Sequence, residues 1–410
     1  MFLNRALNKL KRYRRIVAAI VAGTLIGLLM PDNSPISVSR RSHLLPPNLD
    51  DTYVRESDEG FILDNNDTDA RNCSPQQHIM FLKTHKCASS SVQNLFLRYG
   101  IKHNLSFALP GKGTYFGHPE PFSASWVEDN LFPASGIADI FAVHSRLNGP
   151  ENKKVVAPDA SFITVVRDPP QLFESLYNYF HLDEFFGATL DEYLKFPSDI
   201  QLSLPRLNKR FGPNMMLFDM GVDIRANTTA VEIRRAIDEA DKLFDIVMIS
   251  ERIDESLILL KELLCWDYSD VVFFTKNARR DDMKPHMSEA ATEKLRELNS
   301  GDVLLYDHFL SKHERIVNKY GIAKMANEIS LLNGARQKMF DDCGVRVVNK
   351  SEAAGTLFKE YSDQVNGYAV DTNASPNCLL LSLPELAVLT RLKADAAKLL
   401  GKDKDKKPKK

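Results

Sequence analysis

The sequence predicts an α/β fold in which helices flank a central, mainly parallel sheet. From His78 onward, short apolar runs alternate with amphipathic stretches, which is the pattern of strands joined by helices. The chain has 410 residues, of which 44% are hydrophobic and 26% are charged, enough to bury one large core or two modest ones. That composition excludes collagen-like, coiled-coil and wholly disordered proteins.

The expected strands are the short apolar runs IMFLK, IFAVH, FITVVR and FDIVMIS, at 79–83, 140–144, 162–167 and 244–250. The expected helices are the amphipathic stretches around them, at 90–99, 170–180, 229–243, 255–264 and 288–299. A longer helical stretch runs from about 302 through 320, and another follows Pro384.

Residues 16–30 read IVAAIVAGTLIGLLM and carry no charge. As a helix they would span roughly 22 Å, which is shorter than a typical hydrocarbon core of about 30 Å. The stretch is therefore a cleaved signal peptide or an uncleaved signal anchor, with a buried helix of a cytosolic protein as a third interpretation. The absence of an A-x-A-like site after it favours the anchor. The basic segment 1–15 holds the N-terminus in the cytosol, so the chain beyond the anchor is expected to be lumenal.

Composition divides the rest of the chain. Residues 31–75 are rich in Pro, Asn, Asp and Ser and predict a flexible stem. We expect the folded body at 76–330, a helical extension of it at 331–401, and a solvated lysine-rich tail at 402–410. The net charge is −1, but six of the 53 basic residues precede the first acidic residue, Asp32. The part after residue 30 therefore carries about −7, which disfavours a nucleic-acid partner.

The cysteines and the glycosylation motifs agree with a lumenal body. The five cysteines contain no CxxC pair, so structural zinc is not expected. In an oxidising lumen four of them could form two disulfides. We nominate Cys87 as the free thiol because of the motif that contains it, and the pairing of Cys73, Cys265, Cys343 and Cys378 stays open. Six N-x-[ST] motifs favour a glycosylated protein: Asn66, Asn72, Asn104, Asn227, Asn349 and Asn373.

The segment FLKTHKCASSSVQNLFLRYG, residues 81–100, joins a strand end, a loop of small residues and the start of an amphipathic helix. Backbone N–H groups at a helix N-terminus, with serine hydroxyls and a lysine, form a binding site for a phosphate. The Walker A pattern is absent, and GKGT at 111–114 lacks the first glycine, so a P-loop kinase or GTPase is not supported. The loop consists of Lys83, Thr84, His85, Lys86, Cys87, Ala88, Ser89, Ser90 and Ser91.

A second segment, FITVVRDPPQLFESLYNYF at 162–180, places Arg167 at the end of a buried strand and Ser175 eight residues later on a helix. Ligands of open α/β sheets bind beyond the carboxyl ends of the strands. We therefore expect Arg167 and the Lys83–Ser91 loop to face one nucleotide from two neighbouring strand ends. Arginine suits a bidentate phosphate contact, which Ser175 would complete.

The two segments together resemble the donor site of sulfotransferases that use 3′-phosphoadenosine 5′-phosphosulfate. The strings LKTHKCASSS and VVRDPPQLFES more narrowly resemble the Golgi galactose 3-O-sulfotransferase family, which contains galactosylceramide sulfotransferase. The likeness continues through FDIVMISERIDESLILLKELLCW and covers about residues 76 to 320. One departure is visible, because the family usually has Thr where Cys87 stands.

The resemblance implies a P-loop-like three-layer fold and a role for each motif residue. Lys86 and Ser89–Ser91 would hold the 5′-phosphosulfate, with Lys83, Thr84, Cys87 and Ala88 in the same donor loop. Arg167 and Ser175 would hold the 3′-phosphate. Lys86 would neutralise the leaving oxygen, and either His85 or His144 would take the proton of the attacking hydroxyl. No metal is expected, because a sulfuryl group carries less negative charge than a phosphoryl group.

The implied activity is sulfuryl transfer to the 3-hydroxyl of galactose in a glycolipid or glycoprotein glycan. The implied location is the Golgi membrane, as a single-pass type II protein with the enzyme domain in the lumen. A homo-oligomer stays open, as do another acceptor sugar or position and an inactive, glycan-binding relative.

Some of these residues also have other interpretations. Arg167 could be an ion-pair partner of Asp168 or Glu174, His85 a phosphate ligand, and His144 a buried structural residue. Phe180 and Phe185–Phe186 are expected in the core rather than under a sugar.

Overall fold

The structure of the protein is a computed structural model. The structure describes residues 73–197, 201, 211–225, 227–274, 287–349, 351–353, 356, 358, 367–371 and 373–404, with only the backbone of 401–404. The expected cytosolic segment 1–15, the apolar stretch 16–30, nearly all of the stem, and Asn66 and Asn72 lie outside these residues. None of the helices in the described ranges is long and apolar enough to cross a membrane.

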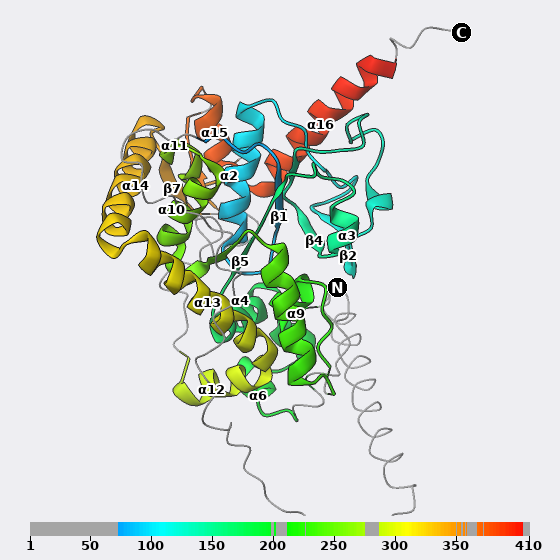
Figure 1. Ribbon diagram of the computed structural model, residues 1–410, viewed down its shortest axis with the longest axis vertical. Coiled ribbons are helices and arrows are strands. Elements are labelled where there is room, and N and C mark those ends of the chain that lie inside the picture. Colours follow the sequence, from blue (N-terminus) through cyan, green and yellow to red (C-terminus); the bar gives the residue numbers. More distant parts are fainter. Residues whose placement is uncertain are drawn as a thin grey trace, which may run out of the picture. The chain divides into compact units, whose positions relative to one another are not determined.

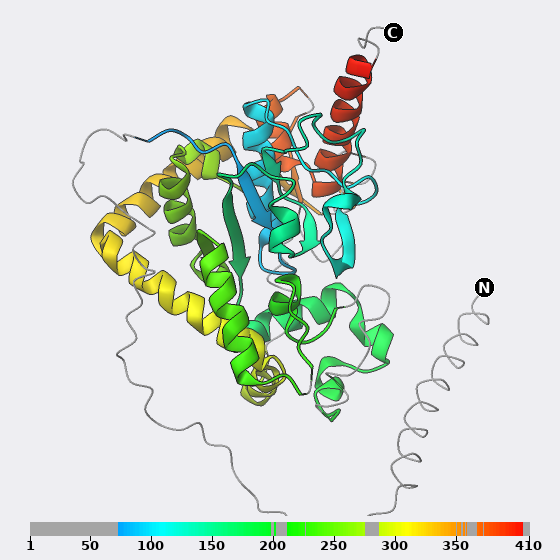
Figure 2. The same cartoon turned by 45° about the vertical axis from the view of Figure 1, so that its right-hand side comes forward.

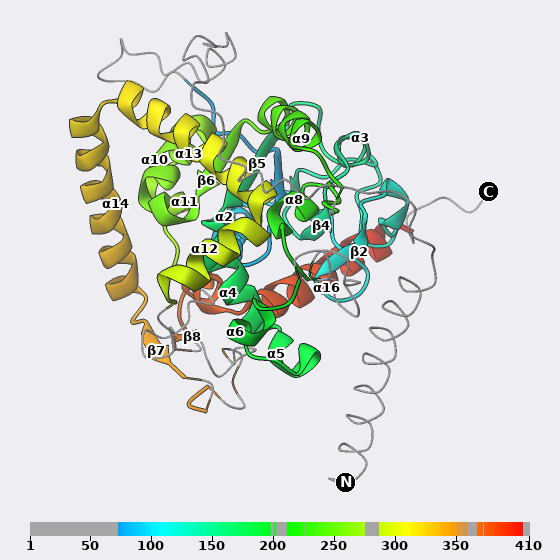
Figure 3. The same ribbon diagram turned by 90° about the horizontal axis from the view of Figure 1, so that it is seen from below.

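A parallel sheet that includes β1 and β5 forms the centre of the described body (Figure 1). It has four strands, in the order β3–β1–β5–β6. Its strands are β1 (Ile79–Leu82), β3 (Ile140–Phe141), β5 (Ser161–Val166) and β6 (Ile246–Ile249), and each neighbouring pair is parallel. Nearly every residue of these strands is buried, as expected for strands covered on both faces. Helices lie on both sides of the sheet (Figure 3). The predicted α/β class with a mainly parallel sheet is confirmed.

One predicted strand is wrong in its extent. The run at 140–144 divides, because β3 ends at Phe141 and His144 begins a separate strand, β4 (His144–Arg146). The carbonyl of Ala142, between them, accepts a hydrogen bond from the side chain of Gln93 (2.6 Å). β4 then pairs with β2 (Tyr115–Pro121), a strand that the sequence did not predict.

The longer helices begin and end close to where the sequence places them. α2 (Ser89–Lys102) follows β1, and α4 (Pro169–Tyr179) follows β5. α9 (Ala230–Leu243) begins with a capping box between Thr229 and Glu232. The others that were predicted are α10 (Ile253–Leu264), α12 (Glu289–Leu298), α13 (Ser300–Tyr320) and α16 (Glu385–Lys404).

Several elements had no clear sequence signal. The longest is α14 (Ile322–Asp342), which runs without a break through residue 330, the expected boundary between the body and its helical extension. A small antiparallel pair, β7 (Arg346–Val348) and β8 (Gly367–Ala369), follows it. The short helices are η2 (Ala124–Trp126), α3 (Gly149–Asn152), α5 (Leu182–Phe186), α6 (Leu190–Tyr193), α8 (Met215–Asp219), η3 (Ser250–Arg252), α11 (Tyr268–Val271) and α15 (Pro376–Ser382).

Two disulfides join distant parts of the body, and all five cysteines lie in the described ranges. Cys73 pairs with Cys265 at the end of α10, and Cys343 at the end of α14 pairs with Cys378 in α15. Cys87 is the free, buried cysteine. The expected free thiol and the expectation of two disulfides are therefore confirmed, and the structure supplies the pairing.

The C-terminal helix α16 begins against the body and projects away from it at its far end (Figure 2). Its first residue, Glu385, accepts a hydrogen bond from Gln93 on α2 (3.1 Å). The helix continues to Lys404 and so includes the first residues of the expected tail.

Candidate functional site

The two sequence motifs meet at the carboxyl ends of β1 and β5. These strands are neighbours, with Leu82 opposite Thr164. The chain leaves β1 towards β3 on one side and leaves β5 towards β6 on the other, so this is the switch point where open α/β sheets bind ligands. The guanidinium of Arg167 donates from Nη1 to the carbonyl of Lys86 (2.9 Å). The predicted convergence of the two strand ends is therefore confirmed.

The loop after β1 has an unusual backbone. Lys86 and Ala88 both adopt the left-handed conformation, with φ of 57° and 60°, which non-glycine residues seldom do. Hydrogen bonds hold the loop in this shape: Thr84 Oγ1 donates to the Val165 carbonyl (2.6 Å), and Ser89 Oγ donates to the Thr84 carbonyl. Strain of this kind, about 1–3 kcal/mol per residue, persists only where the surroundings fix it, and such positions cluster at ligand sites.

The start of α2 has the chemistry of an anion site. The residue at the N-cap of α2 is Ala88, whose side chain makes no capping hydrogen bond, and the first residues of α2 are serines. Among the described residues, the half-buried hydroxyls of Ser90 and Ser175 have no hydrogen-bond partner. Lys86 Nζ lies 3.6 Å from the centre of the Tyr179 ring on α4. Lysine, hydroxyls, a helix N-terminus and Arg167 fit a ligand with more than one phosphate-like group.

Cys87, where the sequence departs from its resemblance, does not weaken this site. Its thiol is fully buried and donates to the carbonyl of His85 (3.2 Å). Burial raises the pKa of the thiol well above its usual value. The side chain therefore belongs to the interior, and the residue contributes to the loop through its backbone.

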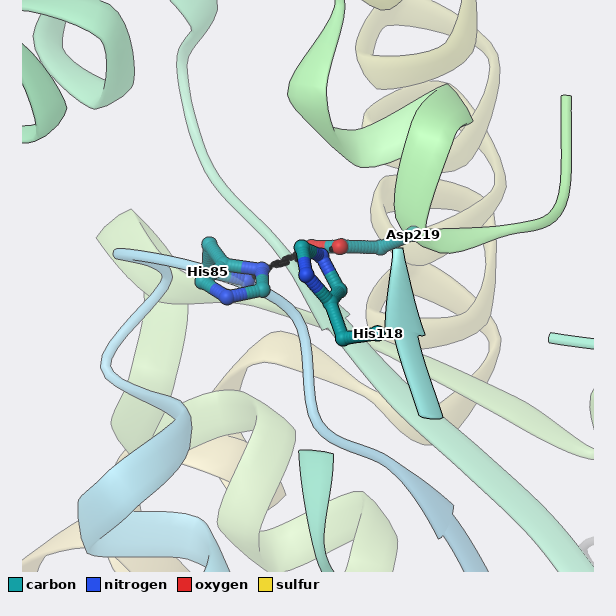
Figure 4. Close-up of side chains that lie close together, drawn as sticks. All are labelled: His85, His118 and Asp219. Carbon is teal, nitrogen blue, oxygen red and sulfur yellow. Dashed lines mark hydrogen bonds and ion pairs between the residues drawn. The ribbon is translucent and has the colours of Figure 1, made fainter. Parts of the chain in front are cut away.

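His85 is held by a carboxylate that the sequence analysis did not find. Asp219, at the end of α8, accepts from the backbone N–H of His85 (2.7 Å) and from its ring Nδ1 (2.9 Å to Oδ1 and 3.0 Å to Oδ2) (Figure 4). Both side chains are buried. Because a carboxylate only accepts, Nδ1 carries a proton, and in the neutral ring the lone pair is on Nε2. Nε2 lies 3.1 Å from the hydroxyl of Tyr115.

The helix that carries Asp219 is held in place by a second buried carboxylate. Asp302, a buried residue near the start of α13, accepts hydrogen bonds from the backbone N–H groups of Met216 (3.0 Å) and Leu217 (2.9 Å). These are orphan donors in the first turn of α8, so Asp302 anchors the short helix that carries the carboxylate.

His144 is buried beside His85 in a different chemical state. Its Nδ1 donates to the carbonyl of Lys83 (3.1 Å), and its Nε2 accepts from Lys83 Nζ (2.8 Å), since an ammonium can only donate. Burial, reinforced by the charge of Lys83, holds the pKa of His144 well below its usual value. His144 is therefore neutral, and its lone pair is occupied. Of the two histidines that the sequence left open as a base, the geometry favours His85.

Aromatic rings surround the two histidines. The rings of His85 and His144 stack at 4.5 Å, and Tyr115 stacks on His144 at 4.5 Å. Phe211 meets the edge of His85 at 5.0 Å and stacks on Phe180 at 3.6 Å. Phe180, expected in the core, is thus half-buried beside the histidines. Flat aromatic faces next to His85 are the kind of surface on which the apolar face of a sugar can stack.

A group that could hold a metal also lies here. His85, His118 and Asp219 each place one ligand atom within 4.8 Å of the others. Figure 4 shows the three side chains facing one another. Asp219 already accepts the Nδ1 proton of His85, so a metal bound at His85 Nδ1 would have to displace that proton. The hydrogen bond favours a histidine–carboxylate pair.

Comparison with known proteins identifies the family. The family model described as galactose-3-O-sulfotransferase matches residues 52–395. The chain belongs to the galactose-3-O-sulfotransferase family. It is 33% identical to mouse galactosylceramide sulfotransferase over 80% of each chain, and 36% identical to the human protein of that name over 67% of this chain and 66% of the relative. Human galactose-3-O-sulfotransferase 2 is 31% identical over 78% of this chain and 84% of its own. No solved structure matches the chain.

Some residues of this galactose-3-O-sulfotransferase family member lie away from their expected contacts. The side chain of Lys83 is buried and bonds to His144 and Glu385. The nearest carboxylate that the structure pairs with Arg167 is Glu251 (3.9 Å), neither Asp168 nor Glu174. Of the sequons in the described ranges, Asn104, Asn227 and Asn373 are exposed and Asn349 is half-buried.

The sequence analysis missed Asp219, Tyr115, His118 and Glu385. None of them lies in a recognisable motif, and each reaches the site from an element outside the two segments that carried the resemblance.

Proposed function

We propose that this protein transfers a sulfuryl group from 3′-phosphoadenosine 5′-phosphosulfate to the 3-hydroxyl of galactose in a glycolipid or glycoprotein glycan. Membership of the family supports the reaction type, and the names of relatives supply the galactose. The observation that carries the proposal is the contact of Arg167 with the Lys86 carbonyl, directly beside the His85–Asp219 pair. This contact places the proposed anion-binding loop and a candidate base together at the carboxyl ends of β1 and β5.

The donor supplies an activated sulfuryl group when it is bound. Lys86 and Ser89–Ser91 hold the phosphosulfate end, with the backbone of Lys83, Thr84, Cys87 and Ala88 shaping the loop. Arg167 and Ser175 hold the 3′-phosphate. A guanidinium has five N–H donors and the contact with Lys86 uses one of them, so Arg167 keeps donors for a phosphate. Lys86 places its ammonium against the oxygen on which negative charge builds.

His85 removes the proton of the attacking hydroxyl. Its Nε2 lone pair points to the position of the Tyr115 hydroxyl, and an acceptor hydroxyl that replaces this contact meets the base directly. Asp219 holds the ring in the required tautomer and stabilises the imidazolium that forms. The aromatic faces of Phe180 and Phe211 keep the site dry. The chain's own residues provide the base and the charge, and no step is assigned to a metal.

The remaining expectations complete the proposal. The catalytic domain has a P-loop-like three-layer fold at 76–330, extended by 331–401 and a tail at 402–410. Residues 16–30 anchor it in the Golgi membrane, with 1–15 cytosolic and 31–75 as the stem. The lumen is oxidising, and the two disulfides of the body support that location. The exposed sequons Asn104, Asn227 and Asn373 are candidates for glycosylation there.

One experiment separates the alternatives. Full-length protein in detergent is applied to immobilised adenosine 3′,5′-bisphosphate and eluted with free nucleotide. The same preparation is then assayed with labelled donor on galactosylceramide, lactosylceramide and N-acetyllactosamine. Retention with transfer to a galactose 3-hydroxyl supports the proposal. Retention without transfer to any of these three acceptors, or transfer to another hydroxyl, indicates a sulfotransferase with another acceptor sugar or position. A folded protein that is not retained has no working donor site and is an inactive, glycan-binding relative.

A further inference from the structure

An ion pair between a buried lysine and a partly buried glutamate links the C-terminal helix to the loop after β1. The side chain of Lys83 is 2% exposed, and its ammonium donates to Glu385 Oε2 (2.9 Å). The two residues are 302 positions apart in the chain, and Glu385 is the first residue of α16. A buried ammonium is costly unless a partner compensates its charge. Glu385 is the carboxylate that compensates it.

The same ammonium determines the state of His144. Lys83 has its second contact with His144 Nε2 (2.8 Å), and the Lys83 carbonyl accepts from Nδ1 of the same ring (3.1 Å). Lys83 therefore holds both nitrogens of His144. Since His144 stacks on both His85 and Tyr115, the contacts form one series from Glu385 through Lys83 and His144 to His85.

We propose that Glu385 is a positioning residue for the reaction: it holds the Lys83 ammonium against His144, so that His144 stays neutral and stacked beside His85. This inference rests on the proposed function, in which His85 is the base. Without the carboxylate, Lys83 loses its compensating charge and its fixed direction. His144 then loses the donor that occupies its lone pair, and it competes with His85 for the proton or leaves the stack.

A purely structural role for Glu385 makes a different prediction. Its other oxygen, Oε1, accepts from Gln93 on α2, which helps to attach α16 to the body. If attachment were its whole role, loss of the negative charge alone would matter little, because a glutamine at 385 keeps an acceptor for Gln93. The positioning role instead depends on the charge, and it affects turnover more than donor affinity.

The test compares Glu385→Gln in the full-length protein with wild type and with Asp395→Asn. Asp395 lies on the same helix, is half exposed, and faces Arg391 at 3.8 Å, so it is a matched loss of one charge away from the site. We expect Glu385→Gln to lower kcat about 10-fold or more, to change the donor KM less than about 2-fold, and to leave nucleotide retention intact. Asp395→Asn is expected to match wild type. A wild-type kcat in folded Glu385→Gln overturns the proposal.

A double variant covers the case in which Glu385→Gln does not fold. Lys83→Met/Glu385→Gln removes both charges, and a buried site tolerates the loss of both charges better than the loss of only one. It is expected to fold, to keep the donor KM within about 2-fold, and to lose at least about 10-fold in kcat. A wild-type kcat overturns the proposal, and so does a donor KM that rises with the loss, since Lys83 would then bind the donor itself. Absence of turnover by wild type would instead reject the proposed function.

Discussion

Replacing Asp219 by asparagine tests the assignment of the base most directly. The two oxygens of Asp219 accept from the backbone N–H and from Nδ1 of His85, at 2.7 Å and 2.9 Å. An asparagine at this position has one carbonyl oxygen and one NH₂ group, so one of the two donors of His85 faces another donor. The ring can relieve this clash by moving its proton to Nε2, which removes the lone pair that takes the substrate proton.

The size of the effect follows from these contacts. A hydrogen bond to a charged group contributes about 1.5–3 kcal/mol, which corresponds to roughly 10- to 150-fold in rate. Loss of the correct tautomer adds to this, and in serine proteases the equivalent substitution of the triad aspartate lowers kcat about 10⁴-fold. We therefore expect Asp219→Asn to lower kcat between about 10² and 10⁴-fold. Donor binding is expected to stay intact, because Asp219 contacts His85 and not the anion-binding residues.

The assay measures labelled sulfuryl transfer at saturating donor, together with retention on the bisphosphate resin and the thermal midpoint. Asp223→Asn is the matched control, since Asp223 is four positions away, about half exposed, and pairs with Arg146 at 3.1 Å. A folded Asp219→Asn variant that binds nucleotide and turns over within about 10-fold of wild type would refute the assignment of His85 as a base oriented by Asp219.

Three further predictions follow from the site. Lys86→Ala and Arg167→Ala are each expected to abolish retention on the bisphosphate resin. The control Arg235→Ala, which removes one side of an exposed ion pair on α9, is expected to keep retention. If both site variants were retained, the proposed donor-binding role of Lys86 and Arg167 would be rejected. The pKa of His144 is lower in the folded protein than in the unfolded chain, so on acidification the unfolded chain binds this proton first. The free energy of unfolding is therefore expected to fall as the pH drops below about 6.5. For this residue the fall is at most about 1.4 kcal/mol per pH unit. Thermal midpoints from pH 8 to 5 check this, and His144→Gln should flatten the curve; an equally steep curve would assign the loss to other groups such as His313, whose pKa is also lowered. Activity is expected to survive EDTA, and a loss that Zn²⁺ restores would instead place a metal at His85, His118 and Asp219.

The sequence predicted those parts of the site that are continuous in the chain. The loop after β1 and Arg167 after β5 are each encoded in one segment, and parallel neighbouring strands bring their carboxyl ends together. The family resemblance then assigned a role to each residue, and the family model that matches residues 52–395 confirms the resemblance. The roles themselves stay proposals.

The groups that orient the histidines could not be predicted in this way. Asp219 lies on a five-residue helix that depends on Asp302 for its first turn, and no local pattern announces either contact. Glu385 lies on a helix that was predicted. An acidic residue in the first turn of a helix is also explained by its favourable interaction with the helix dipole, so the sequence did not indicate a role at the site. The choice between His85 and His144 required the hydrogen bonds of both rings.

The fold shows the same division. Buried parallel strands are continuous apolar runs and were found, whereas β2 is half exposed and contains two prolines and a glycine, which conceal it. α14 was missed although it is long, because few of its residues are buried and its apolar positions make a weak pattern.

The ion pair between Lys83 and Glu385 has a practical consequence for anyone who shortens this protein. A polypeptide cut before residue 385 keeps the loop after β1, both disulfides and Arg167, and these include the groups that we propose a nucleotide affinity column would capture. It would nonetheless carry a buried lysine without its counter-charge. Retention on such a column therefore does not show that a shortened protein is active. Shortened proteins need to be compared by the amount of sulfated product that they form.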